Sequence, residues 1–243
     1  SYNDTNVANG GVYAYAVASY NVNGEGPRTD TVYGYPSTLP DAPRALDGVW
    51  GDRYVNFSWM APPFDGGTPV LGYRIFRAQG IAKLDILNAT NATYYNDTGL
   101  DNGASYRYAV KAFNRRGSSP LSAEFHAVPA TVPDPIFDLT AVPGDRKVDL
   151  TWGPPPYDGG IPHNGYLVYR VEGGNRSMIM TMDPFYREFE DAGLTNGLTY
   201  TYIVTSVNDM GESPPSNAAE ATPIGRPGKP MKLAAMPGDE NVT

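Results

Sequence analysis

The residues of this sequence that could carry out acid–base or metal chemistry are few and scattered. The 243 residues include two histidines, His126 and His163, and no cysteine. A zinc site needs three or four nitrogen, sulfur or oxygen ligands, and activation of a nucleophile needs a positioned base. Two histidines at unrelated positions meet neither need. The sequence therefore predicts a protein that is not an enzyme, with no catalytic residue, no metal ion and no cofactor.

Aspartates, in contrast, recur at fixed places along the chain. Asp65 and Asp158 each precede two glycines, and a second set precedes an Asn-Gly pair. The second set consists of Asp4, Asp97 and Asp191. Because aspartate caps turns by accepting hydrogen bonds from nearby backbone N–H groups, we interpret both sets as turn caps. Calcium binding at Asp158, or at Asp97 with Asp101, is the alternative, although the chain has no loop of alternating oxygen ligands.

One chemical signal exceeds chance, and it is the N-glycosylation acceptor Asn-x-Ser/Thr. With 17 Asn and 30 Ser plus Thr residues, about two acceptors are expected by chance, and seven are present. They are Asn3, Asn56, Asn88, Asn91, Asn96, Asn175 and Asn241. Strand alternation points Asn56 away from Trp59, and three others fall in a variable connection, where a bulky glycan fits. We expect several of them to carry N-linked glycans, on an extracellular or cell-surface protein.

An internal repeat organises these residues. In each copy a Tyr follows the recurring Asp by nine positions, and a second Tyr follows two positions later. The first of these tyrosines, Tyr13, Tyr106 and Tyr200, are spaced by 93 and 94 residues. Such a period is too long for a solenoid unit and is typical of an independent domain. The apolar residues after each Tyr alternate with a period of two, which predicts a half-buried strand.

A second strand of each copy carries a tryptophan. Val55, Phe57 and Trp59 alternate with polar or amphipathic neighbours, and Trp152 repeats Trp59 after 93 residues. A turn rich in proline and glycine follows, and a further strand begins at Gly72 and at its counterpart Gly165. The periodicity predicts that both indole rings point into a core.

Together these residues resemble the fibronectin type III family. The resemblance rests on the inward Trp, the Asp-Gly-Gly loop, the Gly-Tyr that opens the next strand, and a tyrosine corner, in which a buried Tyr hydroxyl reaches upstream backbone. It implies an all-β fold of tandem immunoglobulin-like, seven-stranded β-sandwiches in a linear array. Similar tandem modules occur in secreted and surface proteins of archaea and bacteria and in giant muscle proteins. The integrin-binding Arg-Gly-Asp of the family is absent.

The repeat divides the chain into four predicted parts. Residues 1–37 are the C-terminal part of one domain, 40–131 and 133–224 are complete domains, and 227–243 are the N-terminal part of another. Proline-rich joints favour extended, semi-rigid backbone, so we expect domains that stand end to end as a rod. The two incomplete parts are expected to expose core surface and unpaired edges, and to be unstable alone.

Composition limits the partners. The net charge of −8 argues against nucleic acid, and no segment reaches the roughly 20 apolar residues of a membrane span. Most of the 18 tyrosines occupy strand positions that a sandwich must fill. The aromatic residues expected to make exposed contacts, since aromatic side chains are favoured in recognition surfaces, are Trp50, Tyr33, Tyr35 and Tyr169.

These observations predict a structural or interaction array, which is a rod, spacer, coat or filament component that acts through protein–protein contacts. Its partners would be other proteins, further copies of itself among them, and an archaeal source fits the style of the repeats. Two alternatives remain open. The array could be the accessory spacer of a large secreted enzyme, or an adhesion module that binds a protein or glycan.

Overall fold

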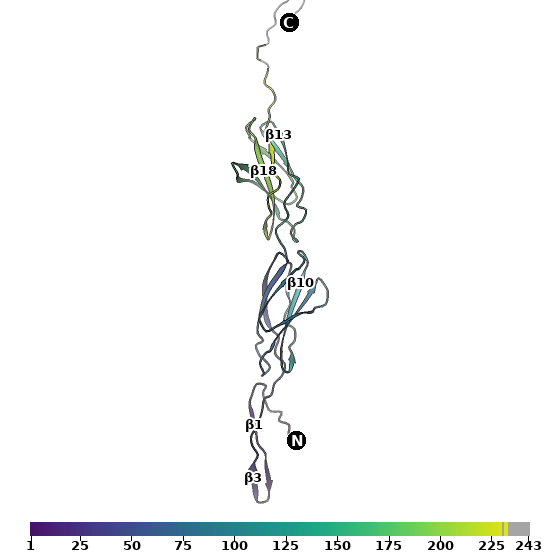
Figure 1. The fold of residues 1–243 in the computed structure, drawn as a ribbon, viewed down its shortest axis with the longest axis vertical. Helices are drawn as coiled ribbons and strands as arrows, with labels where there is room; N and C mark the ends of the chain where they lie inside the picture. Colours follow the sequence, from purple (N-terminus) through teal and green to yellow (C-terminus); the bar gives the residue numbers. More distant parts are fainter. Residues whose placement is uncertain (230, 233–243) are drawn as a thin grey trace, which may run out of the picture. The chain divides into compact units, whose positions relative to one another are not determined.

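The computed structural model describes residues 1–229, 231 and 232, and every regular element within them is a β-strand. The acceptor Asn241 and most of the predicted part at 227–243 lie outside the described residues. The chain divides into two compact units after Thr131. Figure 1 labels β10 (Tyr106–Asn114) in the first unit and β18 (Tyr200–Asn208) in the second. The finer division of the first unit at residues 37–40 stays a prediction. Within the described part, no helix could cross a membrane.

The first unit contains a sandwich of two antiparallel sheets. One sheet has the order β5-β6-β9, and the other has the order β11-β10-β7-β8, with β12 also paired to β10. The three strands of the first sheet are β5 (Arg44–Gly51), β6 (Tyr54–Met60) and β9 (Tyr94–Thr98). The others, besides β10, are β7 (Gly72–Gln79), β8 (Asp85–Thr90), β11 (Gly117–Ser118) and β12 (Phe125–Ala127).

The seventh strand of this sandwich is interrupted, so that β11 and β12 share its place. Between them Ser119 and Ser122 continue the pairing with β10, each accepting a β10 backbone N–H at its hydroxyl, 3.0 Å away. Pro120 lies between these serines and has no N–H to donate to a ladder. The two hydroxyls therefore take the place of backbone carbonyls as acceptors, while the backbone N–H groups of Ser119 and Ser122 still donate to β10.

The second unit repeats the arrangement. Its sheets have the orders β13-β14-β17 and β16-β15-β18-β19, with β20 also paired to β18. The strands of the smaller sheet are β13 (Thr140–Gly144), β14 (Lys147–Thr151) and β17 (Glu188–Ala192). The larger sheet adds β15 (Gly165–Glu172), β16 (Asn175–Met182), β19 (Gly211–Glu212) and β20 (Ala219–Ala221) to β18.

The core of each sandwich lies between its two sheets, as the alternation in the sequence predicted. Val55, Phe57 and Trp59 are buried while the residues between them are exposed. The indole of Trp59 meets the ring of Tyr73 edge-on at a centroid distance of 5.4 Å, and Trp152 meets Tyr166 in the same way at 5.6 Å. The all-β fold and the inward orientation of both tryptophans are confirmed.

The N-terminal residues form a long antiparallel ribbon. Strand β1 (Tyr13–Tyr15) pairs with β4 (Val32–Gly34), and β2 (Ala18–Asn21) pairs with β3 (Gly24–Arg28) (Figure 1). Val17 is 70% exposed, whereas its repeat equivalents Val110 and Val204 are fully buried. The ribbon thus presents to solvent the face that the complete copies use as core.

The connection between the third predicted strand and the tyrosine corner is more regular than its divergent sequence suggested. In both sandwiches it contains an additional edge strand, β8 in the first and β16 in the second. Asn88 therefore lies within β8 and Asn175 begins β16, while Asn91 lies in the turn after β8. Divergence between the copies reflects loose constraints on an edge strand's exposed face rather than the absence of a strand.

Candidate functional site

The tyrosine corner that the sequence predicted is present in all three copies. The hydroxyl of Tyr106 accepts a hydrogen bond from the backbone N–H of Asp101 at 3.1 Å, and that of Tyr200 accepts from Thr195 at 3.1 Å. In the N-terminal copy, Tyr13 accepts from Ala8 at 2.7 Å. In each case the donor lies five residues upstream. The corner fixes the chain as it enters β1, β10 or β18.

The second tyrosine of each copy reaches a carboxylate. Tyr108 donates to Asp97 at 2.8 Å, and the guanidinium of Arg77 contacts both oxygens of the same carboxylate, at 3.0 and 3.1 Å. Asp97 is only 4% exposed. The second sandwich repeats this buried Asp–Tyr–Arg cluster with Asp191, Tyr202 and Arg170, where the Tyr–Asp distance is 2.7 Å.

This cluster corrects the interpretation of Asp97 and Asp191 as turn caps. Both accept their hydrogen bonds from side chains on other strands, because strand alternation turns them inward, where a charge needs partners. Asp4 combines both roles, accepting from the Asn6 N–H at 3.0 Å and from the Tyr15 hydroxyl at 3.0 Å. The cap interpretation holds for Asp65 and Asp158, which accept from the N–H two residues later at 2.8 and 2.9 Å.

The clusters are suited to holding strands together rather than to chemistry. Burial, followed by the hydrogen bond to Asp97, raises the pKa of Tyr108 far above its ordinary value of 10.0, and Tyr202 is raised by burial and Asp191 in the same way. Both phenols therefore stay protonated and donate to the carboxylate. A phenol that cannot ionise near neutral pH is neither a base nor a nucleophile.

Stability should fall at alkaline pH because of these tyrosines. In the unfolded chain a tyrosine loses its proton near pH 10, whereas Tyr108 and Tyr202 keep theirs in the fold. The native state then binds more protons than the unfolded state, so the stabilisation present below pH 10 is lost as pH rises further. For each such tyrosine the expected slope is about half of 1.4 kcal/mol per pH unit at pH 10 and approaches 1.4 near pH 11. Urea unfolding between pH 9 and 11 measures it, and Tyr202→Phe should reduce the slope, whereas exposed Tyr186→Phe should leave it unchanged.

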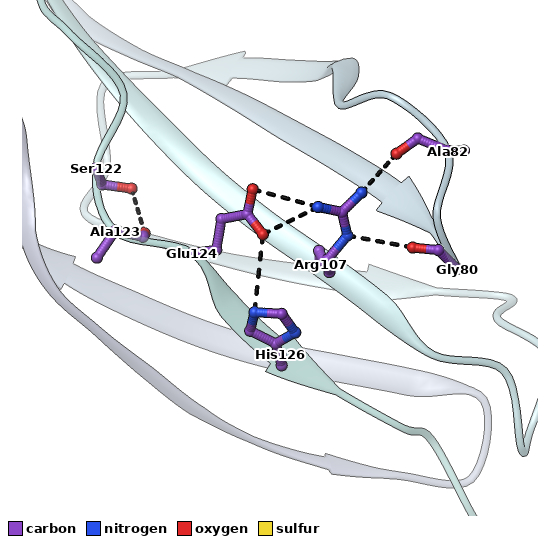
Figure 2. A network of polar contacts seen from close by, with 7 residues as sticks. All are labelled: Gly80, Ala82, Arg107, Ser122, Ala123, Glu124 and His126. Carbon is purple, nitrogen blue, oxygen red and sulfur yellow. Dashed lines mark hydrogen bonds and ion pairs between the residues drawn. The ribbon is translucent and has the colours of Figure 1, made fainter.

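The two histidines lie in separate polar contacts. Figure 2 shows Arg107 of β10 donating to Glu124 at 3.1 and 3.4 Å, and to the carbonyls of Gly80 and Ala82 in the β7–β8 connection. His126 Nε2 lies 3.7 Å from Glu124, at the exposed end of this network. Arg107 thus links the β7–β8 connection to β10, and the imidazole of His126 lies at the exposed end of the network.

His163 contacts the hydroxyl of Tyr166 through Nε2 at 3.1 Å. In the described part of the chain, no three His, Asp or Glu side chains gather in a way that could hold a metal ion. Of the residues named for the calcium alternatives, Asp97 binds Arg77 and Tyr108, and Asp158 accepts from the Gly160 N–H.

The predicted contact aromatics divide into two groups. Trp50, Tyr33 and Tyr35 are 40%, 57% and 66% exposed. Tyr169 is only 8% exposed, so its prediction as an exposed contact is wrong. The guanidinium of Arg176 lies 4.9 Å from the centre of its ring, and its hydroxyl donates to Glu212 at 3.0 Å. Alternation along β15 places the ring of Tyr169 on the outer face of the sheet. The long side chains of Arg176 and Glu212 cover the ring there.

The asparagines of the described residues differ in what their amide nitrogens do. Six of them donate from Nδ2 to a carboxylate or a backbone carbonyl, and none of the six is a glycosylation acceptor. They are Asn102, Asn114, Asn164, Asn196, Asn208 and Asn217.

The acceptor asparagines of the described residues are all exposed, and the structure gives no hydrogen bond from the Nδ2 of any of them. They are Asn3, Asn56, Asn88, Asn91, Asn96 and Asn175. A glycan is attached to this nitrogen, so the atom that must be free for modification is free at each of these positions. Asn6, Asn9, Asn21 and Asn23 are equally exposed and also have no hydrogen bond from Nδ2, so the fold is compatible with modification of the acceptors but does not single them out.

Two antiparallel sheets over a core with an inward Trp and a tyrosine corner define an immunoglobulin-like β-sandwich, here without a disulfide. The fibronectin type III domain model matches residues 41–128 and 134–222. The chain belongs to the fibronectin type III family, whose domains are typically non-catalytic structural and interaction modules.

Three relatives illustrate where similar stretches occur. The chain is 31% identical over 72% of its length to a Kelch domain-containing protein of Saccharolobus solfataricus, covering 23% of that protein. It is 29% identical over 84% of its length to the striated-muscle M-protein of Gallus gallus, covering 14%. It is 30% identical over 90% of its length to exoglucanase B of Cellulomonas fimi, covering 21%. The chain thus spans less than a quarter of each of these relatives.

Proposed function

We propose that this chain is a stretch of an extracellular, N-glycosylated array of fibronectin type III domains that acts as a spacer and interaction surface. The family assignment supports a spacer or protein-contact role, and the two Asp–Tyr–Arg clusters are structural rather than reactive. The observation that carries the extracellular part is the excess of acceptors in the sequence, together with their exposure in the fold. Acceptors exceed chance several-fold, and among the described residues all keep Nδ2 free on the surface.

The array would contact other proteins through exposed aromatic residues. Trp50, Tyr33 and Tyr35 keep much of their surface accessible, and aromatic side chains with exposed polar atoms are favoured at protein–protein contacts. The net charge of −8 keeps such a surface soluble and selects against nucleic acid.

A spacer region within a large secreted enzyme is the second candidate. The similarity to exoglucanase B, over 90% of the chain, favours this candidate, because the relative that contains the matching stretch is named as an enzyme. A catalytic domain adjacent to this stretch in the full-length protein would support the spacer of an enzyme, and further repeats would support the independent array.

The glycosylation proposal predicts a mass above that of the bare polypeptide for protein purified from its natural source. Treatment with a peptide N-glycosidase should convert occupied asparagines to aspartate, and peptide mass spectrometry should find this change only at acceptor positions. Asn114 and Asn217, whose amides bind the carbonyls of Thr38 and Leu139 and which glycine does not follow, serve as internal controls and should stay unchanged. A mass equal to the bare polypeptide would exclude glycosylation and remove the main support for an extracellular location.

A further inference from the structure

The outermost strands of each sandwich are exposed to pairing with another chain. A strand with only one neighbour presents unpaired N–H and C=O groups, and natural proteins protect such edges with proline, charge, bulges or a cover. In the larger sheets, β8 pairs only with β7, and β16 pairs only with β15. These two strands are equivalent elements of the two sandwiches.

Most other edges carry a device in their own sequence. Proline occurs within β13 and in the interrupted strands that follow β10 and β18, and β17 exposes two glutamates. Strand β5 is irregular at its start, and β9 carries a buried carboxylate. The residues concerned are Pro143, Pro120, Pro214, Pro215, Glu188, Glu190 and Asp97.

Strands β8 and β16 each contain one β-bulge, at Leu87 and at Ile179, but no further device in their sequence. Neither contains proline or lysine, and their charges stand only at Asp85 and Arg176, near the strand starts. Their exposed side chains include apolar ones: Ile86 is 65% exposed, and Met178 and Met180 are 58% and 40% exposed. By composition they are suited to pair with an identical strand of a second copy.

Each of these strands carries a glycosylation acceptor. Asn88 lies within β8, and Asn175 is the first residue of β16. Both are exposed, and the one side-chain bond that the structure gives for them uses Asn88 Oδ1, which accepts from the Ala89 N–H. In both sandwiches an acceptor thus lies on an edge strand whose only other protection is one β-bulge.

We propose that N-linked glycans on Asn88 and Asn175 cover the edges of β8 and β16 and prevent their antiparallel pairing with a second copy of this chain. The proposal rests on the glycosylation proposed above and adds a function for two particular sites. A hydrated glycan is bulky, and an incoming strand must approach within about 4.8 Å of the edge. A glycan at the edge therefore excludes the second strand sterically.

The test compares variants of the full chain, secreted from a host that glycosylates Asn-x-Ser/Thr. N88Q/N175Q removes the two edge acceptors, and the control N56Q/N91Q removes the same number elsewhere. Asn56 lies on β6, which has a partner strand on both sides, and Asn91 lies beyond the end of β8. Light scattering after size-exclusion chromatography should show a monomer for the wild type and the control, and a dimer or a larger assembly for N88Q/N175Q, since each chain then has two open edges.

Two further arms separate edge pairing from misfolding. Adding Ile86→Lys and Met180→Lys to N88Q/N175Q should restore the monomer, because a charge on the strand replaces the guard. Wild-type chain produced in a host that adds no N-linked glycans should also associate, because Asn88 and Asn175 then stay unmodified and uncharged. A monomeric N88Q/N175Q, or equal association of the control, would overturn the proposal.

Glycopeptide mapping distinguishes this proposal from the one on which it rests. Unmodified Asn88 and Asn175 beside occupied acceptors elsewhere would overturn only the protection of the edges. A chain with no glycan at any acceptor would overturn both proposals.

Discussion

Replacing Trp152 by alanine is expected to lower the free energy of unfolding of the second unit by about 3–5 kcal/mol. The indole is only 6% exposed and packs in a cluster that includes Tyr166, Val168 and Val204 from the facing sheet. Truncation would leave a cavity bounded by paired strands, and a close-packed interior relaxes only partly around such a cavity. The loss therefore combines lost burial with a cavity that the neighbouring strands cannot close.

Differential scanning calorimetry of the full chain checks this prediction. Phe185→Ala is the matched control, because Phe185 belongs to the same unit but is 87% exposed, and its removal should change stability by less than about 0.5 kcal/mol. Trp59→Ala should produce the same loss in the first unit only, since the two core clusters share no residue. A loss below 1 kcal/mol for Trp152→Ala would contradict the structural role given to the indole.

The features that sequence predicted correctly are those determined by local pattern. Alternation along residues 54–60 is enough to orient Trp59, because successive side chains of a strand point to opposite faces. The hydrogen bond of Tyr106 spans five residues, so a fixed spacing in the repeat is enough to reveal it. The fold class and the tyrosine corner follow from such short-range information.

The features that sequence missed depend on contacts between distant strands. Asp97 meets Arg77 across 20 residues, and Asp191 meets Arg170 across 21, with no pattern in the chain that links them. Tyr169 is covered by Glu212, 43 residues away. Alternation states which face a residue occupies, but whether that face is covered depends on side chains from other strands.

The three copies show why the arginine is needed. Asp97 and Asp191 are buried, and each has an arginine partner in addition to a tyrosine. Asp4 is only partly buried, and in the described chain it has hydrogen bonds from Tyr15 and the Asn6 N–H but no ion pair. Because burial of a carboxylate is costly without a paired charge, the arginine accompanies burial.

Replacing Asp191 by alanine is accordingly expected to lower the stability of the second unit by about 3 kcal/mol, the low end for breaking a buried ion pair. Arg170 would lose all three of its short contacts to the carboxylate, at 2.6, 2.7 and 3.1 Å, and the Tyr202 hydroxyl would lose its acceptor. The side chain of Arg170 is 26% exposed, so water relieves part of the uncompensated charge.

Glu190→Ala is the matched control for this variant, because Glu190 is the preceding residue of β17 and also forms an ion pair, with Lys147 at 2.8 Å. Its side chain is 55% exposed, and exposed pairs contribute about 0–1 kcal/mol. Chemical denaturation should therefore show a much larger loss of stability for Asp191→Ala than for Glu190→Ala, because the two carboxylates are neighbours in sequence but differ in burial.

A triple variant shows whether the stability lost in Asp191→Ala comes from leaving the charge of Arg170 without a partner. If it does, adding Arg170→Met and Tyr202→Phe to Asp191→Ala should recover part of the stability, because replacing a whole buried polar cluster by apolar groups is often close to neutral. A triple variant less stable than Asp191→Ala would instead mean that the arginine and the tyrosine stabilise the sandwich independently of the carboxylate. The repeated cluster would then be a set of separate packing contacts and not one electrostatic unit.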